Sequence, residues 1–338
     1  VYQWSRGPEE AILRVALRPS SGQAIEDLKE RLRHNLGAKF PDVRFSFEPG
    51  DIVSEVMSFG SPTPIEIAVN GATLAENRAY LERVREELAS MAGIRDLQFS
   101  QSLDFPAVAV KMDRQKAGAS GATAAEIARS MLAATSSSRF VVPVFWPDPK
   151  TGIGYQVQVE IPQAAMASVK DLELVPVKRT PSEQLLLRDV AQISEMKVPG
   201  QFDRYNMKRE ISLTANLAGI DLGSASRDVE QAIQRAGELP KGAILQVRGL
   251  IPPLREMISG LTLGLALAFL VIFLLLSANF QSFRLALVTL STAPAILVGV
   301  VTMLSMTGDT INIQSFIGAI MAVGVGMANA ILLVTFAR

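Results

Sequence analysis

One amide, Asn329, is the only strongly polar side chain in GVGMANAILLVTFA, an apolar run near the end of the chain. Polar residues at membrane depth commonly form contacts between helices or mark proton and ion pathways. Asn329 is therefore a candidate for either role. A stripe of small residues accompanies it at every fourth position: Gly318, Ala322, Gly326 and Ala330. Such a stripe is typical of a helix face that another helix approaches closely.

The last quarter of the chain is the part that must position this amide. Charge is confined there to three residues, Arg284, Asp309 and Arg338. The uncharged runs lie at residues 258–278, 285–307 and 311–337. Each is long enough to cross a hydrocarbon core of about 30 Å at about 1.5 Å per residue. Pro294 interrupts the second run, which membrane helices tolerate. We therefore predict three membrane helices.

The loop charges predict an orientation for these helices. Arginines in short loops are retained in the cytoplasm, so Arg284 and Arg338 should face the cytoplasm and Asp309 the opposite side. Residues 1–256 would then lie outside the cytoplasm. No initiator methionine, export signal or earlier span precedes them in the sequence, so we expect this chain to be part of a longer protein.

The composition disfavours several classes of function. Basic and acidic residues number 33 each, and there are 12 methionines, one histidine and no cysteine. Nucleic-acid binding would need a clustered cationic face. We find no nucleophile–base pair, phosphate loop or cluster of metal ligands, so we expect neither an enzyme nor a bound cofactor or metal. Paired acids such as Glu86 and Glu87 fit a solvated helix face.

The preceding residues alternate short strands with amphipathic helices. We expect strands at 11–18 and 43–49, separated by a helix with the stripe Ile25, Leu28, Leu32 and Leu36 that stops at Gly37. Two strand–helix–strand units follow, at residues 64–100 and 210–249. They indicate α+β sandwiches with helices on one sheet face. Residues 140–205 look like an insertion between the two halves of one sandwich. Thr123 and Glu126 predict a capping box.

Several stretches resemble one family of membrane proteins. VAVKMDRQKAGASGATAAEIARSML (residues 108–132) and LLLRDVAQISE (residues 185–195) are similar to soluble segments of resistance-nodulation-division (RND) efflux permeases. ANFQSFRLALVTLSTAPAILVGV (residues 278–300) and the run 311–338 resemble two membrane helices in their second half. The order of elements agrees along essentially the whole chain.

The resemblance implies a division of the chain. Residues 1–60 would end one porter subdomain, residues 61–110 and 206–250 would form a second, and residues 111–205 an inserted docking subdomain. Residues 257–338 would be the eighth to tenth of twelve membrane helices. The resemblance also implies a proton-driven homotrimer in the bacterial inner membrane, with residues 1–256 in the periplasm. Its partners would be a periplasmic adaptor (membrane fusion) protein and an outer-membrane channel, and its substrates small hydrophobic or amphiphilic compounds.

Site residues follow from the same resemblance. In the drug-exporting members, a lysine immediately precedes the asparagine that Asn329 matches and pairs with aspartates of the fourth helix. Ala328 occupies that position here, so the usual lysine switch does not transfer to this chain. Phe45 and Phe47, which share a strand face, would lie beside the substrate pocket. Core packing is the alternative role for both rings.

Two other functions stay open at this stage. An exporter of metal ions from the same superfamily would use methionine thioethers or carboxylates as ligands. A membrane-anchored receptor or protein-translocation factor would use the soluble part to bind a partner, with no transport of small molecules. Polar residues inside the third span argue mildly against an inert anchor.

Overall fold

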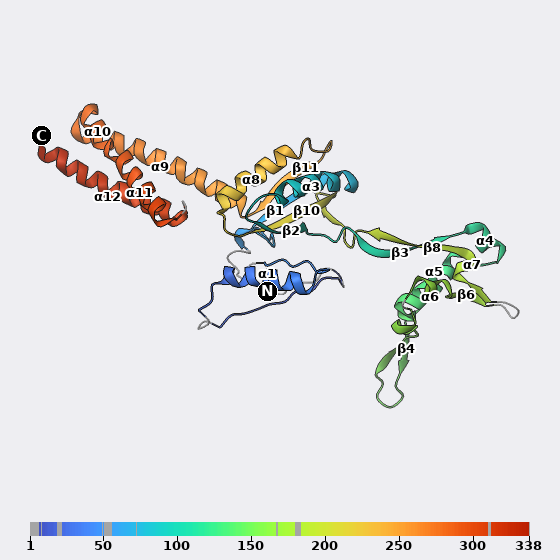
Figure 1. Ribbon diagram of the computed structural model, residues 1–338. Helices are drawn as coiled ribbons and strands as arrows, with labels where there is room; N and C mark the ends of the chain where they lie inside the picture. Colours follow the sequence, from blue (N-terminus) through green and yellow to red (C-terminus); the bar gives the residue numbers. More distant parts are fainter. Residues whose placement is uncertain are drawn as a thin grey trace. The chain divides into compact units, whose positions relative to one another are not determined.

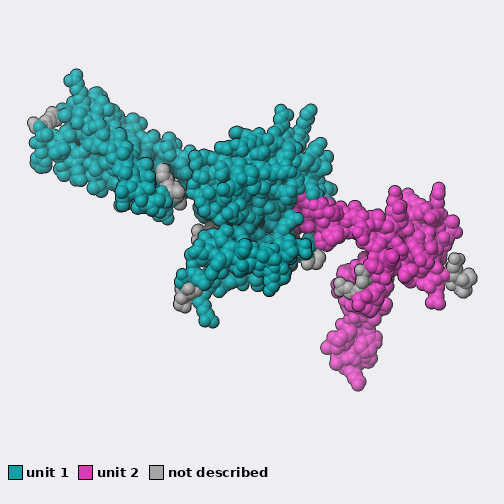
Figure 2. All heavy atoms as spheres, viewed as in Figure 1, with its two compact units in different colours: residues 1–100, 202–338 teal, residues 101–201 magenta. Residues whose placement is uncertain are grey.

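The computed structural model describes residues 7, 9–18, 22–48, 50, 56–71, 73–166, 168–179, 184–309 and 312–337, without the side chains of Gln163 and Ile313. The chain divides into two compact units, residues 1–100 with 202–338 and residues 101–201 (Figure 2). The second unit begins earlier than the predicted docking segment, residues 111–205, because the strand at 105–112 pairs with the strand at 191–198 rather than joining the main sheet.

The main sheet of the first unit has five strands (Figure 1). They are β1 (Ile65–Gly71), β2 (Ile94–Phe99), β9 (Asp203–Tyr205), β10 (Lys208–Leu217) and β11 (Ile244–Gly249). Their order is β11-β1-β10-β2, with β9 also paired to β10, and every pairing is antiparallel. β1 and β2 are therefore parallel but separated by β10, and β10 and β11 are separated by β1. This is the split βαβ arrangement.

Two helices supply the crossovers and cover this sheet. α3 (Leu74–Ala89) connects β1 to β2, and α8 (Leu222–Arg235) connects β10 to β11; the two helices contact each other. Alternate residues of β1 and the inner stripes of both helices are almost fully buried: Ile65, Ile67, Val69, Leu81, Val84, Leu88 and Val229. The period of two in the strand and of 3.6 in the helices produces this common core. The α+β prediction for these residues is confirmed.

The segment before this sheet differs from its prediction. α1 (Ile25–Lys39) forms as expected but continues through Gly37. Residues 11–18 and 43–48 form no strand, so that prediction is wrong for them, and residue 49 lies outside the described residues. A strand requires a hydrogen-bonded neighbour, and no described residue pairs with either stretch.

The second unit has its own core. Its elements are β3 (Phe105–Met112), α4 (Arg114–Ala119), α5 (Ala124–Ser136), η2 (Ser138–Phe140), β4 (Val144–Pro147), β5 (Gly154–Val157), η3 (Gln163–Ala165), α6 (Val169–Glu173), β6 (Pro176–Arg179), β7 (Gln184–Leu186), α7 (Leu187–Val190) and β8 (Ala191–Val198). Ile127, Leu187 and Val190 centre the buried cluster. The capping box is confirmed, because Glu126 N donates to Thr123 Oγ1 at 3.2 Å and Thr123 N to Glu126 Oε2 at 2.8 Å.

Three candidate membrane spans complete the first unit. They comprise α9 (Ile251–Phe280), α10 (Phe283–Leu290) with α11 (Thr292–Thr307), and α12 (Ile313–Ala337). α9 starts earlier than predicted because β11 leads directly into it. At this junction Gly249 has a positive φ, and a side chain there would collide with the carbonyl of Pro64. Only glycine therefore fits this position.

Pro294 explains why the second span is broken. Proline lacks the amide that would donate to the carbonyl four residues earlier, that of Leu290. The helix accordingly divides at Ser291. Nearby hydroxyls bond carbonyls of the preceding turn: Ser291 Oγ donates to Val288 O at 2.7 Å, and Thr292 Oγ1 to Thr289 O at 2.8 Å.

Candidate functional site

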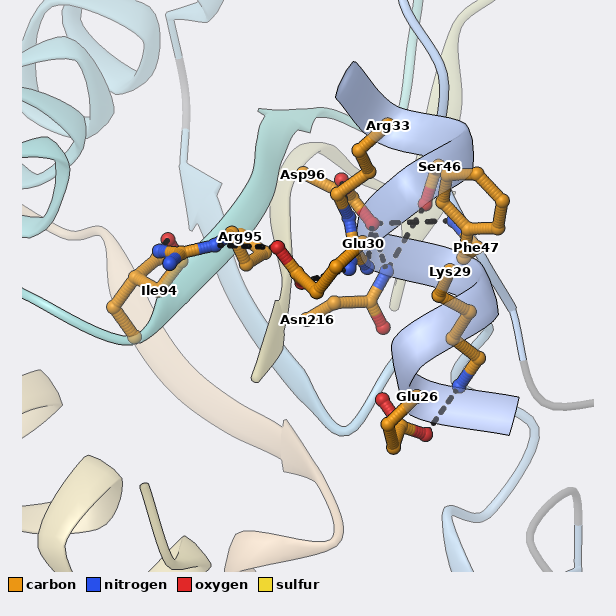
Figure 3. A network of polar contacts seen from close by, with 10 residues as sticks. All are labelled: Glu26, Lys29, Glu30, Arg33, Ser46, Phe47, Ile94, Arg95, Asp96 and Asn216. Carbon is orange, nitrogen blue, oxygen red and sulfur yellow. Dashed lines mark hydrogen bonds and ion pairs between the residues drawn. The ribbon is translucent and has the colours of Figure 1, made fainter. Parts of the chain in front are cut away.

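Asp96 is the centre of a polar cluster that connects α1 to the main sheet (Figure 3). Its carboxylate accepts two hydrogen bonds from Arg33, from Nε to Oδ1 and from Nη2 to Oδ2, each 2.7 Å long. Asn216 Nδ2 and the backbone N of Phe47 donate to Oδ2 at 2.8 and 3.2 Å. The Asp96 side chain is only 5% exposed. We call these four residues the Asp96 cluster.

The backbone around Asp96 directs its carboxylate toward α1. Asp96 has a φ of 51°, in the left-handed region, which aspartate tolerates better than most residues. The partner strand β10 has a register shift between Thr214 and Asn216, so the ladder is irregular on both sides. Irregularities of this kind re-aim side chains and recur near functional sites. The four hydrogen bonds to Asp96 help to hold its unusual conformation.

The charges around Arg33 reinforce this connection. Its hydrogen bond to the Asp96 carboxylate raises the pKa of the Arg33 guanidinium, so this side chain stays charged. Arg33 Nη1 also lies 2.5 Å from Glu30 Oε1, and Glu30 Oε2 lies 3.8 Å from Arg95 Nε of β2. Acidic and basic groups therefore alternate from α1 to β2.

Phe47 lies within this charged environment. The Arg33 Cζ atom lies 4.9 Å from the centroid of the Phe47 ring, a cation–π contact. Phe45 and Phe47 are both half-buried. Neither lines either of the two grooves that we describe below. The structure thus brings Phe47 to a guanidinium and a carboxylate, and a role for either ring in binding substrate stays a prediction.

A second polar cluster lies on the face of the sheet opposite the core residues Ile65, Ile67 and Val69 of β1. Arg248 Nη1 and Nη2 donate to the two carboxylate oxygens of Glu210 at 2.8 Å each, and Nη1 lies 3.5 Å from Glu66 Oε1. Ser212 Oγ donates to Glu66 Oε1 at 2.9 Å. Glu66, Glu210 and Ser212 are buried, and the hydrogen bonds with Glu210 raise the pKa of Arg248. We call these four residues the Arg248 cluster.

This cluster has oxygen ligands but also its own counter-ion. Two carboxylates and a hydroxyl are groups that bind hard cations, yet Arg248 already neutralises part of their charge. Among the described residues, no group of three or more histidine, aspartate or glutamate side chains is arranged to hold a metal ion. The expectation that the protein holds no resident metal therefore stays a prediction.

Two grooves are present in the first unit. One, of about 520 Å³, is lined by Asp221 and Arg227 of α8 and by residues near the end of α11, including Asp309. Hydrogen bonds from Ser224 lower the pKa of Asp221, which caps α8. The other, of about 300 Å³, is lined by Gly71 and by residues of the β9–β10 hairpin.

Asn329 lies on the outer face of α12 within this chain. Val323 and Met327 are buried in the cluster that also contains Ala293 of α11, and Ala330 is buried too. The Asn329 side chain is exposed, and the structure gives its amide no hydrogen-bond partner among the described residues. A membrane-embedded amide requires such partners, so a contact between Asn329 and another helix stays a prediction.

The small-residue stripe is only partly covered. A side chain at Gly326 would collide with Ile296 of α11, and Ala330 is buried. Ala322 is half-buried, whereas Gly318 is exposed with open space beside it. Gly326 therefore allows α11 and α12 to approach closely. A packing role for Gly318 stays a prediction.

Sequence reasoning missed both polar clusters. Their residues come from segments far apart in the sequence, and each looks ordinary when considered alone. One signal was available: charged or amide residues interrupt otherwise apolar strands, as Glu66 does in PIEIAV and Asn216 does in ISLTAN. Charges inside a buried strand require partners, but pairing them across β1, β10 and β11 requires the strand order.

Several known proteins similar to this chain are named for metal resistance or cation efflux. It is 26% identical over 262 residues to the cobalt-zinc-cadmium resistance protein CzcA of Cupriavidus metallidurans, covering 76% of this chain and 24% of that protein. It is 24% identical over 285 residues to the cation efflux system protein CusA of Escherichia coli, covering 84% of this chain and 27% of that protein. The chain therefore spans about a quarter of the length of these relatives.

A solved structure has the same fold. A crystal structure of a heavy metal efflux pump superposes with a TM-score of 0.72 and 23% identity, over 94% of this chain and 32% of that one. The model of the AcrB/AcrD/AcrF family matches residues 2–338, which is essentially the whole chain. Together with the split βαβ sheet, the inserted unit and the three apolar helices, this match confirms the resemblance to RND permeases: the chain belongs to the AcrB/AcrD/AcrF family.

Proposed function

We propose that this chain is part of an RND-type transporter that exports metal cations. The relatives named for cobalt, zinc, cadmium and cation efflux match three quarters or more of the chain and support this substrate class. They favour it over the small hydrophobic compounds that the sequence suggested, which remain the competing substrate class. Family membership also favours transport over a receptor with an inert membrane anchor.

The surroundings of Phe47 argue against an apolar pocket for hydrophobic compounds at this ring. An apolar pocket suited to hydrophobic compounds would place this ring among other apolar groups. The ring instead lies beside Arg33, whose guanidinium is bound to Asp96. The buried carboxylates Glu66 and Glu210 of the main sheet supply oxygen atoms, but both already pair with Arg248, so the relatives carry the substrate class.

The coupling step in this proposal uses Asn329. An amide does not titrate at ordinary pH, so Asn329 can only orient water or a carboxylate from another helix. Its exposed position on α12 leaves it free to face helices that this chain does not contain. With Ala328 beside it, the titrating group must lie on one of those helices.

The same proposal includes location and partners. The transporter would be a homotrimer in the bacterial inner membrane, with residues 1–256 in the periplasm, and would act with an adaptor protein and an outer-membrane channel. The Arg284 loop would face the cytoplasm and the Asp309 loop the periplasm. Arg338, the other predicted cytoplasmic charge, lies outside the described residues.

Growth of cells that lack their own exporters can distinguish the two substrate classes. Cells expressing the full-length protein should tolerate more zinc, cobalt or cadmium but no more dye or detergent than control cells. The Asn329→Leu variant, matched for abundance in the membrane, should lose this tolerance. Resistance to dyes or detergents without resistance to any of the three metals would contradict the proposal.

A further inference from the structure

The hairpin formed by β9 and β10 carries cations that have no acidic partner. Its turn residues, Asn206 and Met207, have left-handed φ angles of 48° and 65°. Arg204 and Arg209 lie directly opposite each other in the ladder, where like charges destabilise an antiparallel pair. No carboxylate of the described residues forms an ion pair with Arg204, Lys208 or Arg209. This hairpin therefore places three cations together beyond Asp203 and Glu210, and the pairing of Arg204 with Arg209 costs stability.

These cations line the pocket of about 300 Å³ beside Gly71. Two of their side chains are held in place from within the protein. Lys208 Nζ donates to the carbonyl of Gly242 at 3.3 Å, and the Arg209 Cζ lies 4.5 Å from the centroid of the Phe202 ring. The guanidinium of Arg209, held in this way, matches a carboxylate in geometry and charge, and the Lys208 ammonium adds a second positive charge. The pocket is thus prepared to receive an acidic group.

Met207 lines the pocket, and the hairpin and the residue before it carry two further exposed apolar side chains. Met207 is 90% exposed at the tip of the hairpin, Phe202 is 52% exposed and Tyr205 is 44% exposed. Methionine, aromatic residues and arginine are the types enriched where proteins bind one another. A free inorganic anion would use the cations alone, whereas a protein surface would also cover these apolar groups.

The register of the sheet places this pocket away from the membrane end. Gly249, which leads into α9, pairs with Ile65 at one end of β1, whereas Arg209 pairs with Gly71 at the other. Six residue steps of about 3.4 Å separate these ends by about 20 Å along the strand. The hairpin is therefore suited to a soluble protein rather than to lipid headgroups.

We propose that the β9–β10 hairpin is a docking site for a partner protein that presents carboxylates next to an apolar side chain. The carboxylates bind Arg204, Lys208 and Arg209, and the apolar side chain packs on Met207 and Phe202. This inference does not depend on which substrate the transporter exports.

A labelled peptide can test this site on the full chain in lipid nanodiscs. The probe is a 12-residue peptide of alternating glutamate and leucine, and its fluorescence anisotropy reports binding. The double variant Arg204→Ala/Arg209→Ala should weaken binding at least tenfold, and Met207→Ala about threefold. Arg139→Ala is the matched control, because Arg139 also lies on an exposed ring, with its Cζ 4.4 Å from the Phe140 centroid; it should change nothing.

Competing ligands make the result decisive. A glutamine–leucine peptide should not bind, and inorganic phosphate or vesicles of anionic lipid should not displace the acidic peptide. Displacement by 10 mM phosphate would indicate a small-anion site, and displacement by vesicles a lipid site; either would overturn the proposal. So would equal binding by all the arginine variants.

A photocrosslinker in place of Met207 in the full-length protein gives a second, independent readout. A crosslink to a separate polypeptide that the double arginine variant abolishes would support docking. A crosslink to the protein's own chain would overturn the proposal, because it would show that the hairpin is covered from within.

Discussion

Breaking the Asp96 cluster should release α1 from the sheet. Arg33→Met keeps the length of the side chain but leaves the nearly buried Asp96 carboxylate without its guanidinium. Removing one partner of a buried ion pair costs about 3 to 5 kcal/mol. Arg33 is slightly exposed at 13% and Asn216 still donates to Asp96, so we expect the lower end, about 3 kcal/mol. No residue of α1 is fully buried, so little else would compensate for the loss.

Hydrogen exchange measured by mass spectrometry reads this release locally, without requiring the membrane helices to unfold. A loss of about 3 kcal/mol corresponds to exchange about 150-fold faster in residues 25–48, or to complete loss of protection there. Exchange in α3 and β1 should change much less. Asp96→Asn should act in the same direction, because asparagine tolerates the left-handed backbone but carries no charge.

A matched control and a double variant identify the cause. Arg31 lies on the same helix and, among the residues that the structure describes, donates only to Gln23 Oε1, at 3.3 Å, so Arg31→Met should leave exchange unchanged. The double variant Arg33→Met/Asp96→Asn should lose less than the sum of its single variants, because neither then leaves a charge unpaired. Exchange in residues 25–48 that changes less than threefold in both single variants would refute this account of the cluster.

Three further predictions concern other parts of the chain. Phe47→Ala should cost about 1 kcal/mol by removing the cation–π contact with Arg33, and hydrogen exchange in residues 25–48 should become faster. Relative resistance to metals and dyes should stay constant. A change in resistance to one compound alone would instead place the ring in a substrate path. Asp309→Cys in the full-length protein should react with an impermeant thiol reagent from the periplasmic side, and labelling from the cytoplasmic side alone would reverse the proposed orientation. Hydrogen bonds from Ser224 lower the pKa of Asp221 in the folded state, so the Asp221 carboxylate stabilises the fold above its unfolded pKa of about 3.9, and this effect is lost as the pH falls through the lower folded value. The protection of α8 against hydrogen exchange should therefore drop below about pH 4 in the wild type. An Asp221→Asn variant that shows the same drop would count against this cause.

The sequence was sufficient to predict elements whose residues repeat in a regular pattern. Each such pattern depends on the surroundings of a single element, so each element could be assigned from its own residues. The patterns are the apolar stripes of α3 and α8, the alternation in β1 and the uncharged membrane spans. Pro294 likewise indicated the irregular second span, although the division into α10 and α11 at Ser291 appears only in the structure.

The strands that the sequence predicted wrongly depend on contacts between distant segments. Residues 11–18 and 43–48 have the composition of strands, but a strand forms only where a neighbouring edge is available, and composition does not report that edge. The pocket role of Phe47, which the resemblance implies, stays a prediction, but its contacts with Arg33 and Asp96 could not be read from the sequence, because these residues lie 14 positions before it and 49 after it. Long-range pairing of charges leaves no period in the sequence.

The central claim is that this chain is part of a proton-coupled exporter of metal cations in which Asn329 belongs to the coupling route. The most direct test is proton flux driven by zinc in proteoliposomes that contain the full-length protein, normalised to the amount of assembled protein. We expect zinc to drive flux in the wild type, Asn329→Asp to retain part of it, and Asn329→Leu to abolish it while the protein stays assembled. Normal zinc-driven flux in the leucine variant would show that Asn329 serves only in packing, and flux driven by a hydrophobic dye but not by zinc, cobalt or cadmium would contradict the substrate class.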